Sequence, residues 1–212
     1  MLNYLRRKPF TDGMALRPSR KEKKLALKLQ VIIGSTRPTR RGPIVAKWFA
    51  EFAKQHGKFD VELVDIADFK FPVYDEPKHP ATGQYEHEHT KRWSAKIKSA
   101  DAFVFVHPEY NYFAPPALVN ALNYVFAEWN YKPAGLVSYG GISGGLRAAQ
   151  SLKLILTTLK MVPLTEGVPV PNFNGMIGKD DVFAPTDPVK EGSTKLLDEL
   201  VRWAEALKPM RK

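Results

Sequence analysis

Short apolar runs and amphipathic segments alternate along the chain, and this alternation restricts its fold more than any other feature. The apolar runs predict five strands, at residues 27–34, 59–66, 102–107, 134–139 and 162–170. Apolar positions at helical spacing predict five helices, at residues 44–55, 86–99, 115–129, 144–161 and 193–207. Apolar strands that alternate with helices are typical of a parallel sheet covered on both faces. Five strands favour a flavodoxin-like, doubly wound α/β fold over the six-stranded dinucleotide-binding fold.

The composition is that of one domain with a substantial core, which we expect over residues 27–212. Hydrophobic residues make up 44% of the 212 positions. The absence of cysteine excludes disulfides, a thiol nucleophile and thiolate-bound metals, and we predict no metal site. No apolar run approaches the roughly 20 residues of a membrane span, and nothing resembles a signal-peptide core. We therefore expect a cytoplasmic protein.

Basic residues are concentrated before the first strand. Residues 1–30 hold nine Lys or Arg against two acidic residues, so they account for +7 of the net charge of +10. We expect residues 1–26 to form a flexible extension, since chain ends are often poorly ordered. Contact of this extension with nucleic acid or anionic lipid is the alternative that the charge leaves open. A transit peptide is a third explanation, although the segment is poor in serine.

The loop after the first strand has the composition of a phosphate site. The apolar run stops at Gly34, and hydroxyl and guanidinium groups follow before the next helix, at Ser35, Thr36, Arg37, Arg40 and Arg41. A helix N-terminus presents free backbone N–H groups and partial positive charge to an anion. The loop matches neither the Walker motif nor the dinucleotide fingerprint. An ordinary helix start with solvated arginines is the alternative explanation.

The loop after the third strand combines a histidine with several aromatic rings. Pro108 restricts the residue before it to extended geometry, and Asn111 tolerates a left-handed turn. The rings at positions 110, 112 and 113 could flank a flat ligand, or they could pack in the core. His107 taken alone is more often a buried structural histidine than a base.

The loop after the fourth strand holds four glycines within six positions, from Gly140 to Gly145. Glycine lets the backbone approach a ligand closely, but it costs conformational entropy on folding. That cost favours a binding role over a merely flexible turn.

Together the three loops resemble the NADPH-dependent FMN reductase family, a flavodoxin-like group that includes chromate, quinone and azo-dye reductases. The motifs that carry the resemblance are GSTRPTRRG, PEYN and YGGISGG, in that order. The passage VELVDIADFKFPVYDEP is also similar to the family's second strand and the loop after it. The resemblance covers residues 27–207 and leaves the basic extension outside.

The resemblance implies FMN and NADPH (or NADH) as cofactors, with binding residues in each loop. The FMN phosphate would be held by Ser35, Thr36 and Arg37, with Arg40 nearby. The isoalloxazine edge would be lined by Pro108, Glu109, Tyr110 and Asn111, with backbone amides near N5 and O4. The pyrimidine end would be approached by Gly140, Gly141 and Ser143. Three roles stay open for the side chain of Glu109: a contact with the flavin, a helix cap, and a bridge to a partner subunit.

The implied reaction needs no protein acid or base in its first half. NAD(P)H would pass hydride to flavin N5, flanked by Tyr110 and Asn111, and a quinone, azo compound or second flavin would then be reduced in a ping-pong cycle. Two other functions stay open: a flavodoxin-like electron carrier, and a flavin redox sensor whose basic extension binds a polyanion. A carrier is usually acidic, whereas the rest of this chain carries a net +3.

The resemblance also implies a homodimer or homotetramer. The predicted helix at 115–129 carries more aromatic side chains than one inward face needs, which favours an interface. A wide buried face is the alternative explanation of the same pattern.

Overall fold

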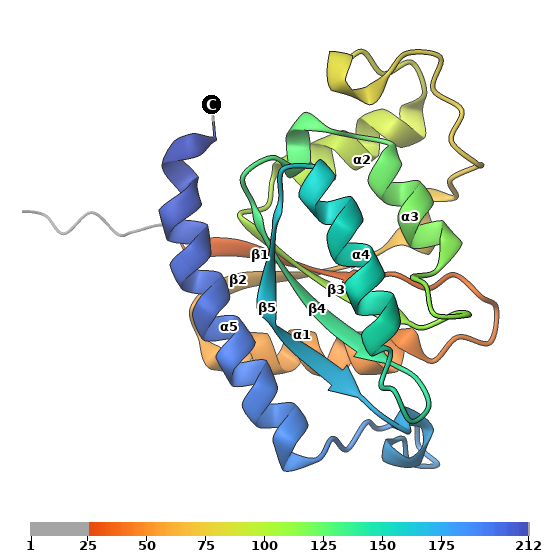
Figure 1. Ribbon diagram of the computed structural model, residues 1–212, viewed down its shortest axis with the longest axis vertical. Coiled ribbons are helices and arrows are strands. Elements are labelled where there is room, and N and C mark those ends of the chain that lie inside the picture. The colour runs from red at the N-terminus through yellow and green to blue at the C-terminus, as the bar shows by residue number, and fades with distance from the viewer. Residues whose placement is uncertain (1–25, 212) are drawn as a thin grey trace, which may run out of the picture.

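The computed structural model describes residues 26–211 and contains a five-stranded parallel sheet in the order β2-β1-β3-β4-β5 (Figure 1). The strands are β1 (Leu27–Ile33), β2 (Phe59–Asp65), β3 (Ala102–Pro108), β4 (Pro133–Tyr139) and β5 (Val162–Val170). The predicted flavodoxin-like sheet is confirmed, with each strand within two residues of its predicted bounds. The predicted basic extension lies outside the described residues, except for Ala26.

Helices cover both faces of the sheet (Figure 1). On one face lie α1 (Gly42–His56) and α5 (Asp187–Leu207), and on the other lie α2 (Glu88–Lys98), α3 (Pro116–Asn123) and α4 (Leu146–Thr158). Successive residues of a strand point to opposite faces, so Val31 packs in the core beneath α1 and α5, while Ile32 packs in the core beneath α2, α3 and α4. Both side chains are fully buried, as the continuous apolar runs predict.

Helix α3 ends at Asn123, six residues before its predicted end. At its end, the indole N–H of Trp93, from α2, donates to the carbonyl of Ala121 at 2.9 Å, and that of Trp129 donates to the carbonyl of Leu122 at 3.2 Å. In a continuing helix the Leu122 carbonyl would instead accept from the backbone four residues on. The side chains of Trp93 and Trp129 therefore cap the end of α3.

Helix α5 begins at Asp187, six residues before its predicted start. Pro188 and Gly192 look like helix breakers in the sequence, but proline is well tolerated in the first turn. Helix α1 ends as predicted, because Gly57 takes the left-handed conformation that closes a helix (φ 78°).

The strand order brings four loops to one edge of the sheet. Ile33 pairs with Val106, Pro108 with Tyr139, and Tyr139 with Val170. The carboxyl ends of β1, β3, β4 and β5 therefore lie side by side, where ligands bind in sheets of this type. Within residues 26–211, no helix combines the length and apolar character that crossing a bilayer would require.

Candidate functional site

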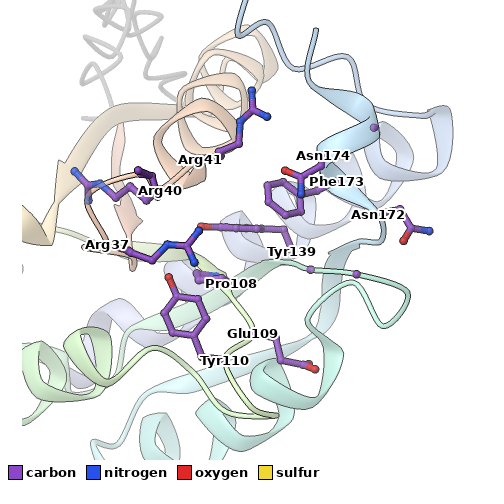
Figure 2. A pocket seen from close by; sticks show the side chains of 14 residues that line it. Arg37, Arg40, Arg41, Pro108, Glu109, Tyr110, Tyr139, Asn172, Phe173 and Asn174 are labelled. Atoms are coloured by element: carbon purple, nitrogen blue, oxygen red, sulfur yellow. The ribbon is translucent and has the colours of Figure 1, made fainter. Parts of the chain in front are cut away.

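A cavity of about 630 Å³ lies at this edge, between the loops that follow β1, β3, β4 and β5 (Figure 2). Seven of the eleven predicted site residues line it: Arg37, Arg40, Pro108, Glu109, Tyr110, Gly140 and Gly141. The other four are Ser35, Thr36, Asn111 and Ser143, which lie in the same loops but do not line the cavity. The three predicted loops therefore converge.

Helix α1 points its N-terminus at the cavity without a side-chain cap. Arg41 occupies the N-cap position, makes no capping hydrogen bond with the described residues, and is followed by a first turn that holds no acidic side chain. A side-chain oxygen of Ser, Thr, Asp or Asn at the N-cap commonly satisfies one of these first amides. An uncapped start surrounded by arginines favours a bound anion.

The arginines of the first loop have different partners. Arg40 forms a two-pronged ion pair with Asp65 (Nη1–Oδ1 2.7 Å, Nη2–Oδ2 2.5 Å) and also donates to the carbonyl of Ser35. Arg41 pairs with Asp181 at 2.8 Å on the surface. Arg40 thus holds the first loop in place by linking the Ser35 carbonyl to Asp65. Its predicted contact with the phosphate stays a prediction.

The guanidinium of Arg37 makes no hydrogen bond or ion pair with any residue from 26 to 211, and only its backbone carbonyl is engaged, by the N–H of Arg40 at 3.0 Å. Figure 2 shows its side chain extending into the cavity, with the hydroxyl ends of Tyr110 and Tyr139 directed toward it. No described residue occupies this guanidinium, so among the arginines of the loop it is the one that is available to a ligand.

Tyr139 is a lining residue that the sequence analysis missed. Its ring is buried and packs on Phe173 at 4.7 Å between centroids, and its hydroxyl donates to Oγ of the buried Ser35 at 3.4 Å. Burial raises the pKa of Tyr139 to about 12, so the hydroxyl keeps its proton. A Cβ at Gly42 would collide with both hydroxyl oxygens, which explains the glycine at the start of α1.

The loop after β3 forms a tight turn. Tyr110 and Phe113 exchange two backbone hydrogen bonds, at 2.9 and 3.0 Å, and the residues between them, Asn111 (φ 50°) and Tyr112 (φ 72°), are both left-handed. Asn111 therefore adopts the left-handed conformation that the sequence analysis said it could tolerate. The same conformation costs about 1–2 kcal/mol at Tyr112. The guanidinium of Arg147 lies over the Tyr112 ring, 4.0 Å from the ring centroid.

His107 is fully buried and does not line the cavity. Its Nδ1 donates to the carbonyl of Pro108 at 3.0 Å. Burial lowers the pKa of His107 to about 4, so the ring is neutral at pH 7. It is the buried structural histidine that the sequence analysis favoured over a base.

Glu109 caps α4. Its Oε2 accepts from the backbone N–H groups of Arg147 and Ala148, at 3.1 and 3.3 Å, and its Oε1 accepts from Arg147 Nε at 2.8 Å and from the hydroxyl of Ser143 at 3.2 Å. Of the roles left open for this side chain, the structure supports the cap. Ser143, predicted to approach a flavin, turns its hydroxyl to Glu109.

The glycines of the third loop serve two purposes. Gly144 (φ 59°) and Gly145 (φ 79°) are left-handed, and a Cβ at Gly145 would lie 2.9 Å from Ser138 Cβ and from the backbone N of Tyr139. These two glycines are required by the fold. A Cβ at Gly141 would meet nothing within 4 Å, although Gly141 lines the cavity. Gly141 is thus a lining residue whose Cβ position is open.

A fourth wall, also missed, follows β5 and consists of residues 172–175. It is fastened to the glycine loop, since the N–H of Asn172 donates to the carbonyl of Gly141 at 2.9 Å. The signal that could have revealed it is the fifth parallel strand, whose carboxyl end must lie at the same edge. No group of three or more His, Asp or Glu side chains within residues 26–211 is arranged to hold a metal ion.

Comparison with known proteins agrees with this geometry. Residues 27–175 match the NADPH-dependent FMN reductase family. The chain is 46% identical to an NAD(P)H-dependent FMN reductase of Schizosaccharomyces pombe over 140 residues, which cover 65% of this chain and 70% of the relative. It is 36% identical to an NAD(P)H-dependent FMN reductase of a Nectria species over 191 residues, covering 82% and 94%. A quinone reductase of Escherichia coli is 30% identical over 185 residues, covering 82% and 90%.

Among solved structures, the chain is similar to FerB, a flavoenzyme NAD(P)H:(acceptor) oxidoreductase from Paracoccus denitrificans. The TM-score is 0.66 at 20% identity, and the match covers 85% of this chain and 98% of FerB. At that identity the likeness supports the flavodoxin-like fold alone.

Proposed function

Because the chain belongs to the NADPH-dependent FMN reductase family, we propose that its cavity binds FMN and that the enzyme passes electrons from NADPH or NADH to a quinone, an azo compound or a free flavin. The observation that carries this proposal is the contrast between the two ends of the cavity. One end has an uncapped helix start and Arg37 without an acidic partner among the described residues. The other has the open glycine loop at Gly141.

The residues present fit FMN. A phosphate needs strong donors, and α1 amides, Arg37 and the hydroxyl of Tyr139 gather at one end of the cavity. A flat ring system needs a backbone that can approach closely, and the space at Gly141 supports that need. We therefore assign the phosphate to the loop of Ser35, Thr36 and Arg37, and the ring to the loops of residues 108–111 and 140–143.

Bound FMN would supply the redox chemistry, namely hydride transfer from NAD(P)H and delivery of the electrons to a second substrate in alternating half-reactions. The protein's own task is to position and to provide charge. Arg37 and the α1 amides neutralise the phosphate, Tyr110 provides one wall, and the ion pair of Arg40 with Asp65 keeps the first loop in place.

We also propose that the chain forms a homodimer or homotetramer, and the support comes from the family resemblance. Two of the aromatic residues that favoured an interface, Tyr124 and Trp129, are fully buried in the core of the chain, and a third, Phe126, is half-buried against it. An apolar face does exist beside α3, where a second cavity of about 760 Å³ lies next to Val73, which is 88% exposed. Sedimentation velocity would measure the number of chains.

The decisive experiment follows the visible spectrum of the FMN-loaded protein under anaerobic conditions. We expect NADPH to bleach the bound flavin and a quinone to restore its colour. Flavin that binds but is not bleached by NADPH would favour the electron carrier or the redox sensor. A protein that binds no flavin would refute the assignment of the cavity.

A further inference from the structure

Two helices start at the cavity, and their N-termini have opposite electrostatic surroundings. Within residues 26–211, no carboxylate lies in the first turn of helix α1 or caps its start, and Arg37, Arg40 and Arg41 precede it. Helix α4 also has no acidic residue in its own first turn, but Glu109, supplied by the loop after β3, caps it. One helix start is left to a ligand and the other is already neutralised by the protein.

Glu109 is committed to this position. Its side chain is 8% exposed and pairs with Arg147 (Oε1–Nη2 2.6 Å) in addition to its four hydrogen bonds. Burial alone would raise the pKa of Glu109, but the hydrogen bonds from Arg147 and the α4 amides outweigh it and hold the pKa below its usual range. The carboxylate is therefore ionised at neutral pH.

The position also joins two walls of the cavity. Glu109 belongs to the loop that contains Tyr110, while Ser143 and Arg147 belong to the glycine loop and the helix it feeds. Arg147 in turn covers the ring of the left-handed Tyr112. One side chain thus fixes the distance between the two loops assigned above to the isoalloxazine ring.

A carboxylate at this position also removes positive potential. The N-terminus of a helix carries about half a unit of positive charge, and Arg147 adds a full unit. A reduced flavin is more negative than an oxidised one, so positive potential at the ring favours reduction, and its neutralisation opposes reduction.

We propose that Glu109 is a positioning residue that ties together the two loops beside the flavin ring and lowers the reduction potential of bound FMN. This inference rests on the proposed function, since it requires FMN in the cavity. It assigns to Glu109 a role in setting how readily the flavin is reduced, acting through α4 and Arg147.

The test measures the midpoint potential of bound FMN in Glu109→Gln, Arg147→Gln and the double variant. Glutamine keeps an oxygen that can accept from the α4 amides but removes the charge. We expect Glu109→Gln to bind reduced FMN about tenfold more tightly relative to oxidised FMN, which raises the potential by about 30 mV for a two-electron couple. Arg147→Gln should lower the potential, and the double variant should return close to the wild-type value.

Opposite shifts in the two single variants would support the proposal, because loosened packing alone would move both potentials in one direction. An unchanged potential in Glu109→Gln, with FMN still bound, would overturn it. If Glu109→Gln fails to fold, as judged by thermal unfolding of the apoprotein, Arg147→Gln decides the question, and a potential that is unchanged or raised would overturn the proposal. A wild-type protein that takes up no FMN would overturn the proposed function itself.

Discussion

Alanine at Gly141 should weaken FMN binding without destabilising the apoprotein. The added Cβ meets no protein atom within 4 Å, and Gly141 is not among the left-handed glycines, so the fold accepts the methyl group. A glycine-to-alanine change at such a compatible position stabilises a protein by about 0.4–1 kcal/mol. For a chain of this size, that is an increase of about 1–4 °C in the melting temperature of the apoprotein.

The same methyl group would occupy the space assigned to the flavin. Forcing an extra methyl group into a packed contact costs about 1–3 kcal/mol, which corresponds to a rise of roughly 5- to 150-fold in the dissociation constant of FMN. The matched control is Gly145→Ala, where left-handed strain of about 1–2 kcal/mol adds to a close contact with Ser138 Cβ at 2.9 Å. That variant should lose roughly 10 °C in melting temperature before any ligand is added.

Both variants are compared by thermal unfolding of the apoprotein and by titration of flavin fluorescence. The reasoning is refuted if Gly141→Ala binds FMN as tightly as the wild type, because the open side of the glycine loop would then not face the cofactor. It is equally refuted if Gly141→Ala destabilises the apoprotein as much as Gly145→Ala does.

Three further predictions concern the charges at the site and a buried histidine. Arg37→Ala should weaken FMN binding about 10- to 100-fold through the lost charge-assisted hydrogen bonds, while the affinity for riboflavin, which lacks the phosphate, stays unchanged; an equal loss for both flavins would place the phosphate elsewhere. Arg40→Ala leaves Asp65 without its partner in a pair whose side chains are 18% and 19% exposed, and the apoprotein should lose about 2–3 kcal/mol; calorimetry showing an unchanged melting temperature would contradict the bracing role. The pKa of His107 falls from 6.5 to about 4 on folding, so the unfolded chain binds more protons between these values and stability should fall by up to about 3 kcal/mol as the pH drops from 7 to 4. Denaturant titrations at both pH values measure this fall, and His107→Gln should reduce it.

The sequence was sufficient for the parts of the fold that depend on local pattern. Strand β1 follows from its apolar run, because burial on both faces leaves a continuous apolar signal. The flavodoxin-like order was favoured by the number of strands, five rather than six. The three loops of the site follow from the rule that parallel strands end at one edge. Their glycine, proline and arginine content marked them as unusual connections.

What the sequence could not predict depends on contacts between distant residues. The pairing of Arg40 with Asp65 spans 25 positions, and that of Glu109 with Arg147 spans 38. In both pairs a charged side chain is neutralised by another residue of the protein and is therefore not available to a ligand. No local sequence pattern distinguishes such a residue from Arg37, whose guanidinium has no partner among the described residues. The same holds for Tyr139, whose hydroxyl reaches Ser35 from 104 positions away.

The capping of α3 by two tryptophans has a consequence for the order in which the molecule assembles. Helix α3 has eight residues, fewer than the roughly 12 to 15 at which an isolated helix becomes even marginally stable in water. It can persist only once α2 has brought Trp93 against it, so we expect it to form late. The turn at residues 110–113 lies just before α3, and the wall of the cavity that contains Tyr110 therefore takes shape together with that late step. A chain in which α3 has not yet formed then lacks a complete binding site. A ligand of the cavity therefore binds only the molecules that have completed folding.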